Sequence, residues 1–171
     1  MSEFPAAAEG PWRTNVVQDF ASSELFDRTF HEGMELVEET AAYLDGSGRQ
    51  DSRLLSRAAA LAYAAQSMRL TTRLMQVASW LLVQRAVREG DMPAAEACQE
   101  RYRLSEAVAA EAAADPDLPG NLLNLLERSS RLYERVLHLD RRMYLEPTQE
   151  ETPHPVLSQM ERLQAAFGRA S

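Results

Sequence analysis

The chain has 171 residues, enough for one domain with a substantial core, and its 18 basic and 26 acidic residues give a net charge of −8. This charge argues against general binding to nucleic acid or to anionic membranes, and no apolar run of about 18 residues predicts membrane insertion. Isoleucine is absent while alanine and leucine are abundant, which favours helices over sheets. The single cysteine, Cys98, and the lack of a signal peptide at the N-terminus predict a reducing, cytoplasmic location.

Residues 1–20 mix prolines, a glycine and scattered charges, and we expect them to form a mobile N-terminal arm. A helical-bundle domain is predicted for residues 21–145. Its first helix begins near Ser22 or Ser23, both good N-caps, and ends at the glycines of residues 45–48. The apolar face of this helix is predicted to hold Phe26, Phe30, Met34, Val37, Ala41 and Leu44.

Residues 52–89 predict one long central helix, because they contain no proline or glycine. Asp51 or Ser52 is the expected N-cap, and Gly90 ends the helix. Two apolar seams run along this helix. The first steps by four and three through Leu54, Ala58, Leu61, Ala65, Met68, Thr72, Met75, Ser79, Leu82 and Ala86, and the second contains Leu70, Leu74, Val77 and Leu81. Two seams predict burial on more than one side.

The third segment, residues 92–113, is acidic and rich in alanine, and we expect a shorter, less buried helix there. The break at residues 115–120 contains two prolines and a glycine. A last strong helix runs from Asn121 to about Leu145, with the seam Leu122, Leu125, Ser129, Leu132, Val136, Leu139 and Met143.

The predicted fold is therefore all-α: an up-down bundle of three long helices with one shorter helical segment and flexible termini. Residues 23–45 carry seven acids against Arg28, whereas the central helix carries six arginines, so we expect these two helices to neutralise each other. The second seam of the central helix exceeds what three helices need, which predicts a homodimer.

Residues 146–171 predict a flexible C-terminal tail, because three prolines interrupt its first half. A short amphipathic helix is expected near its end, with its apolar face formed by Val156, Met160, Leu163 and Phe167. About a dozen residues are too few for a stable isolated helix. The segment therefore either packs on its own bundle or folds in a partner's groove, and we treat its apolar face as a candidate partner site.

Catalytic and metal-binding patterns are missing from the sequence. A helical di-metal site requires two motifs in which histidine follows glutamate by three residues, and only His154, after Glu151, has this spacing; Glu134 with His138 is typical of a surface pair. Cys98 has no neighbouring histidine or cysteine, and no glycine-rich phosphate loop occurs. We expect no cofactor, no metal and no enzymatic activity.

One stripe of the central helix combines Arg69, Arg73, Gln76 and Trp80. Arginine and tryptophan are enriched where proteins bind one another, so this stripe is a second candidate partner site. The alternative is structural: the arginines pair with acids of the first helix while Trp80 fills the edge of the core.

The same stretch carries a family resemblance. Residues 67–82, SMRLTTRLMQVASWLL, resemble the signature segment of the alphaproteobacterial RcdA family, the regulators of CtrA degradation. Residues 28–34 with Tyr43 and Leu44 are similar to the first helix of that family, and Ser130, Tyr133, Arg135 and Val136 are similar to its last. The match covers about Phe26 to Met143.

This resemblance implies a dimeric helical bundle without enzymatic activity that acts as an adaptor in cell-cycle proteolysis. The implied partners are the ClpX unfoldase with the ClpP protease, a response-regulator-type adaptor, and substrates such as the response regulator CtrA. Two other functions remain open from the residues alone: a DNA-associated regulator that uses the central arginines, and a bundle that senses a small molecule.

Overall fold

The structure is a computed structural model that describes residues 11–105 and 115–144. Within these residues every regular element is helical. The elements in chain order are α1 (Pro11–Ala21), α2 (Glu24–Asp45), α3 (Ser47–Arg53), α4 (Arg57–Glu89), α5 (Ala94–Ala97), the 3-10 turn η1 (Glu100–Tyr102) and α6 (Gly120–Tyr144).

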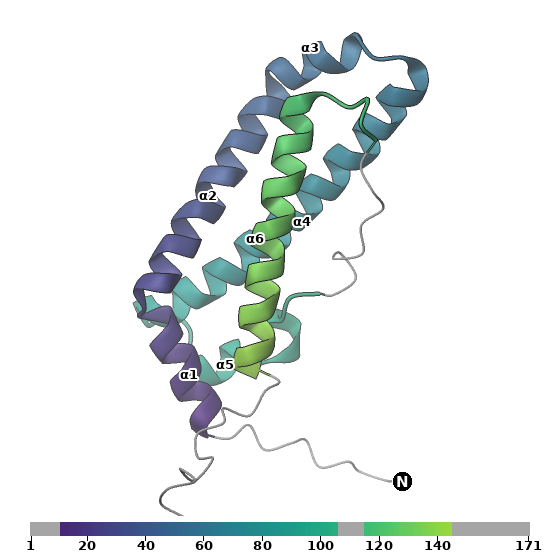
Figure 1. The fold of residues 1–171 in the computed structure, drawn as a ribbon. Coiled ribbons are helices and arrows are strands. Elements are labelled where there is room, and N and C mark those ends of the chain that lie inside the picture. The colour runs from purple at the N-terminus through teal and green to yellow at the C-terminus, as the bar shows by residue number, and fades with distance from the viewer. Residues whose placement is uncertain (1–10, 106–114, 145–171) are drawn as a thin grey trace, which may run out of the picture.

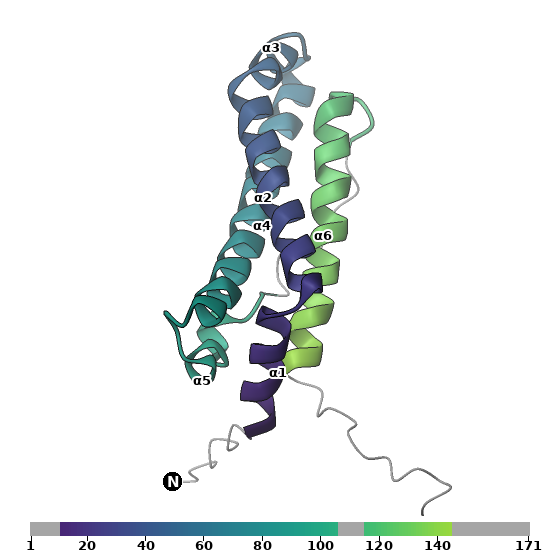
Figure 2. The ribbon, with the colours of Figure 1, turned by 90° about the vertical axis from the view of Figure 1, so that its left-hand side faces the viewer.

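The long helices α2, α4 and α6 pack side by side, with each contacting the other two (Figure 1). Helix α3 lies at one end of this bundle, and α1 and α5 lie at the other end, as the turned view in Figure 2 also shows. The predicted all-α bundle of three long helices is confirmed. In the part of the chain that the structure describes, no helix is both long and apolar enough to cross a membrane.

Helix α2 begins where the sequence predicts. Ser23 is its N-cap, and the Ser23 hydroxyl accepts a hydrogen bond from the backbone N–H of Phe26 at 3.2 Å. The buried side of α2 differs from the predicted apolar face. Its buried positions include Thr29, Gly33 and Thr40, which were not predicted to lie on that face. Phe30 and its apolar neighbours on the predicted face pack around the rim of the core.

The central helix starts later than predicted. Residues 47–53 form the separate helix α3, and α4 begins at Arg57. Neither Asp51 nor Ser52 caps α4. Ser56 does so, because its backbone is extended and its hydroxyl accepts a hydrogen bond from Ala59 N–H at 3.2 Å. Gly90 ends the helix with φ of 81°, a left-handed conformation that glycine adopts without steric cost.

The structure also differs from the sequence prediction at both short segments. Residues 11–20, expected within the arm, belong to α1, where Val17 is fully buried against the bundle. Residues 92–105 form only the four-residue α5 and the turn η1 rather than one helix, yet Ala97 and Leu104 are buried. These apolar side chains cover the end of the bundle, and that burial stabilises a segment with weak helical periodicity.

Only one of the two predicted seams of α4 enters the core. Leu70, Leu74, Val77 and Leu81 are buried between α2 and α6. The larger residues of the first seam lie on the outside, with exposed fractions from 50% to 87%: Leu54, Leu61, Met68, Met75 and Leu82. We call these five residues the outer seam; Leu54 lies at the C-terminal end of α3, and the other four lie on α4.

The acids of α2 are neutralised mainly by α6 rather than by α4. Arg128 of α6 lies 2.7 Å from Glu39, and Arg135 of α6 pairs with Glu32. Arg88 of α4 also pairs with Asp27 at one end of the bundle. Of these three ion pairs, only that of Arg88 with Asp27 joins α2 to α4 as predicted. These pairs are partly exposed, so each adds little to the stability of the bundle.

Candidate interaction site on the central helix

The stripe that sequence analysis singled out faces α6 rather than α2. Arg73 is 2% exposed, and its guanidinium donates to the Ser129 hydroxyl at 2.8 Å and to the Leu126 carbonyl at 3.2 Å. Burial lowers the pKa of Arg73 from its ordinary value. An arginine so buried, with hydrogen bonds to α6, anchors the two helices to each other.

Trp80 lies two steps beyond Arg73 along the same stripe and is also buried. Its indole N–H donates to a carboxylate oxygen of Asp140 on α6 at 2.9 Å, and its ring lies 5.7 Å from that of Phe20 on α1. The structural alternative from sequence analysis expected arginines paired with α2 acids. Arg73 instead binds Leu126 and Ser129 of α6. Trp80 is buried, and its partner is an acid on α6.

Gln76 and Arg69 complete the stripe and are more accessible. Gln76 is half-buried, and its Oε1 atom has no hydrogen-bond partner among the described residues. Arg69 is exposed. The stripe thus divides into two buried anchors, Arg73 and Trp80, and two residues that a partner could reach. The use of this stripe by a partner stays a proposal, as does that of the tail residues, which lie outside the described residues.

Asp140 was missed by sequence analysis. Its carboxylate is fully buried and accepts hydrogen bonds from Trp80, from Arg103 at 3.3 Å and from the Leu104 N–H at 3.4 Å. Burial raises the pKa of this carboxyl, and the three donors oppose that rise. In the sequence, Asp140 could have been noticed as an acid that lies between Val136 and Met143 of the apolar seam.

Asp140 and Tyr133 together hold the chain at residues 103–105 against α6. Tyr133 donates its hydroxyl to the carbonyl of Ser105, while Asp140 binds the two preceding residues. The backbone at Arg103 is extended. Residues 103–105, which we call the wall, therefore lie opposite the exposed edge of α4.

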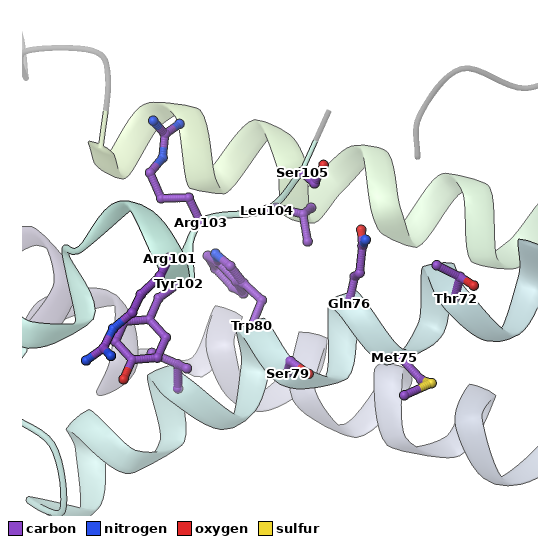
Figure 3. Close-up of a pocket in the computed structure, with 11 residues that line it drawn as sticks. Thr72, Met75, Gln76, Ser79, Trp80, Arg101, Tyr102, Arg103, Leu104 and Ser105 are labelled. Carbon is purple, nitrogen blue, oxygen red and sulfur yellow. The ribbon is translucent and has the colours of Figure 1, made fainter. Parts of the chain in front are cut away.

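A cavity of about 540 Å³ opens between this wall and α4 (Figure 3). The lining has apolar and polar side chains from three segments: Thr72, Met75, Gln76, Ser79, Trp80 and Val83 from α4, Arg101 and Tyr102 from η1, and Arg103, Leu104 and Ser105 from the wall. Gln76 and Trp80, two residues of the stripe, thus contribute to the lining of this cavity.

A second, larger hollow of about 800 Å³ lies between α2 and α6. Its walls carry Glu32 and Arg135, which pair with each other, and Arg131, which pairs with Glu127 of its own helix. These charged side chains are paired, as Arg101 and Arg103 of the first cavity are with Glu96 and Asp140.

In residues 11–105 and 115–144, no group of three histidine, cysteine or acidic side chains is arranged to hold a metal ion. Cys98 is buried. Among these residues, the most distinctive surface is the apolar outer seam of α4 with the adjoining cavity.

The fold and this surface define an all-helical bundle with exposed apolar side chains along its central helix. The chain belongs to the family described as "Protein of unknown function (DUF1465)", whose model matches residues 17–167. It is also similar to RcdA from Caulobacter crescentus CB15, a solved structure with 71% sequence identity and a TM-score of 0.64. That match covers 76% of this chain and 99% of the solved chain, so this protein is a member of the RcdA family. No curated protein matches the chain.

Proposed function

We propose that this protein is a non-enzymatic adaptor that promotes degradation of CtrA-type response regulators by the ClpXP protease. Its partners are ClpX with ClpP, a response-regulator-type adaptor and the substrate. Family membership supports this proposal, because the resemblance on residues 67–82 implied the same activity. The protein acts by bringing these partners together and catalyses no reaction itself.

The observation that carries the proposal is the outer seam of α4. Four large apolar side chains repeat every seventh residue along the outside of α4, from Leu61 to Leu82, and Leu54 at the end of α3 precedes them. A soluble monomer rarely leaves so continuous an apolar line uncovered. The line is typical of a surface that binds another helix, which suits a protein that works through contacts.

We further propose that a second copy of the chain covers part of this line in a homodimer. Small residues separate the large ones along the same face: Ala58, Ala65, Thr72, Ser79 and Ala86. Large side chains of one α4 can therefore pack over small residues of its counterpart. The dimer stays a proposal, and the face assigned to it changes, because the second seam, from which the dimer was predicted, is covered by α2 and α6 of the same chain.

Reconstituted proteolysis tests the adaptor function. Purified ClpX, ClpP, ATP and a CtrA-type substrate are combined with the response-regulator adaptor, and substrate loss is followed with and without this protein. We expect faster loss only when this protein is present, and an unrelated ClpXP substrate should be degraded at an unchanged rate. An unchanged rate of CtrA-type substrate loss with all components active contradicts the proposal.

A further inference from the structure

The end of the outer seam that lies next to α3 combines exposed apolar and basic side chains. Leu54 is 87% exposed and Leu61 is 68% exposed. Arg53 directly precedes Leu54, and Arg57 lies one helical turn before Leu61 on the same face of α4; both arginines are exposed. We call these four residues the basic end. Figure 1 shows that α3 and the start of α4 lie at the end of the bundle away from α1 and α5.

The two arginines of the basic end are not neutralised by the described residues. Arg49 of α3 pairs with an acid of α2, whereas Arg53 and Arg57 form no ion pair with any residue in 11–105 or 115–144. The nearest acid in the sequence, Asp51, accepts a hydrogen bond from the Tyr43 hydroxyl instead. In a chain of net charge −8, the basic end is therefore a local positive surface.

The residues of the basic end contribute little to folding. Arg57 is the first residue of α4, and the first turn of this helix contains no acid. Because the N-terminus of a helix carries partial positive charge, an arginine there is disfavoured. Leu54 and Leu61 are also placed where the fold of the chain does not bury them. Apolar side chains left exposed in this way, beside unpaired charges, are typical of a surface that binds another molecule.

A second copy of the chain does not neutralise this end through α4. Residues 52–88 contain six arginines and no acid, so two α4 helices that pack against each other bring no acid to these arginines. The proposed homodimer therefore uses the seam from Met68 to Leu82 and leaves the basic end to a different partner.

We propose that the basic end binds an acidic amphipathic helix of a partner protein. Apolar side chains of that helix pack on Leu54 and Leu61, and acids on its flanks lie beside Arg53 and Arg57. The proposal names the chemistry of one partner for the adaptor function given above and rests on it.

An acidic helix matches both the spacing and the charge of this surface. Leu54 and Leu61 are seven residues apart, and a helix that packs along another helix presents apolar residues at the same interval, with charged residues on its flanks. Acids on those flanks attract the two arginines and speed association, whereas a basic helix is repelled. Charge thus selects the partner, and the leucines supply apolar contact.

Fluorescence anisotropy of labelled, capped peptides with the full chain tests the proposal. The first probe is the acidic amphipathic peptide Ala-Glu-Leu-Ala-Glu-Glu-Leu-Ala-Glu-Leu-Ala-Glu-Glu-Leu. A basic counterpart has Lys in place of every Glu, and an acidic counterpart has Ser in place of every Leu. Sedimentation with vesicles of phosphatidylglycerol and phosphatidylcholine at physiological salt tests for a membrane surface as the alternative target.

We expect the acidic leucine peptide to bind saturably, and the other two peptides to bind at least several times more weakly. Leu61→Ser should weaken binding about tenfold, because an apolar contact is lost. Arg57→Gln should weaken it severalfold while the melting temperature stays the same or rises, since a positive charge leaves the helix N-terminus.

Two matched controls lie on α2. Arg28→Gln removes an exposed arginine that likewise forms no ion pair with a described residue, and Leu25→Ser removes an exposed leucine that lines the hollow between α2 and α6. Both variants should bind the acidic leucine peptide as the unmodified chain does.

The proposal is overturned if the acidic leucine peptide does not bind saturably at about a millimolar, or if the basic peptide binds equally well. Binding that Leu61→Ser and Arg57→Gln weaken no more than the two controls do also overturns it. Sedimentation with the vesicles that Leu61→Ser abolishes, without peptide binding, assigns the basic end to a membrane instead. A chain that ends at Glu146 and binds the peptide at least tenfold more tightly than the full chain assigns it to the tail.

This measurement contains no protease, so it separates the two proposals. A failure of peptide binding with intact substrate delivery rejects the basic end alone. A failure of delivery with intact peptide binding rejects the adaptor function alone.

Discussion

The indole N–H of Trp80 on α4 donates to the carboxylate of Asp140 on α6 at 2.9 Å, and both side chains are shielded from solvent. The same carboxylate also binds Arg103 and the N–H of Leu104. One buried acid thus joins the central helix, the last helix and the segment that walls the cavity. The stability of the bundle and the shape of its candidate site depend on the same residue.

Trp80→Ala should lower the free energy of unfolding by about 3–5 kcal/mol, because it removes a large buried ring. Trp80→Phe should cost about 1–3 kcal/mol, since Asp140 then lacks one of its donors. Urea unfolding followed by circular dichroism measures both. If Trp80→Ala unfolds at the wild-type urea concentration, the ring does not anchor the core and acts as a partner contact instead.

Asp140 should make the stability depend on pH. Burial raises the pKa of this carboxyl in the folded protein, so the folded state binds the proton more tightly than the unfolded chain does. The stability from that proton is present below the unfolded pKa, about 3.9, and is lost as the pH rises through the folded pKa.

Denaturation of the wild type and of Asp140→Asn at several pH values from 4 to 7 isolates this effect. The stability of the wild type relative to the variant should decrease as the pH rises. A difference that stays constant, or that increases with pH, is inconsistent with a raised pKa at Asp140.

Gly33 marks a close approach of α2 to α4. A Cβ atom at this position would lie 2.7 Å from Cδ1 of Leu81, which is fully buried. Gly33→Val should therefore lower the free energy of unfolding by about 1–3 kcal/mol through overpacking. Gly120→Ala is the control, because no atom lies within 4 Å of the added Cβ and alanine favours the helix. Thermal unfolding of both variants checks this, and equal melting temperatures argue against a tight crossing.

Met68 lies at the middle of the outer seam and is 72% exposed. Met68→Glu should convert the proposed dimer to a monomer, because it places a charge in an apolar interface, while the melting temperature of the monomeric fold changes little. Sedimentation equilibrium at tens of micromolar measures the mass. Leu25→Glu on α2 is the control, since Leu25 is also exposed but lines the hollow between α2 and α6. A wild-type protein that sediments as a monomer refutes the dimer.

A variant that ends at Glu146 tests whether the tail acts as a tether. We expect an unchanged melting temperature and oligomeric state but lost stimulation of substrate degradation, because Val156, Met160, Leu163 and Phe167 are proposed to engage a partner. The measurement is the reconstituted proteolysis described above, with the full chain as the reference. Full-rate delivery by the shortened protein shows that the tail is not a tether.

The candidate site was predictable only in part. Arginine, glutamine and tryptophan recur at helical spacing between Arg69 and Trp80, so the sequence alone indicated a notable stripe. It did not indicate that Arg73 and Trp80 are anchors, because their partners Ser129 and Asp140 lie more than fifty residues away. The wall of the cavity was missed because residues 92–113 were expected to form one helix, whereas contacts with Tyr133 and Asp140 of α6 hold residues 103–105 in an irregular conformation.

The number, type and approximate ends of the long helices follow from the sequence by itself. Helical periodicity, the cap at Ser23 and the stop at Gly90 are local properties, and local properties are encoded in neighbouring residues. The sequence also contains both seams of α4. Which seam is buried was decided by the tertiary structure, because periodicity shows that a face is apolar but not which helices lie against it. Leu70 and Leu81 meet α2 and α6, and the outer seam is left free for another molecule because those two helices occupy the opposite side.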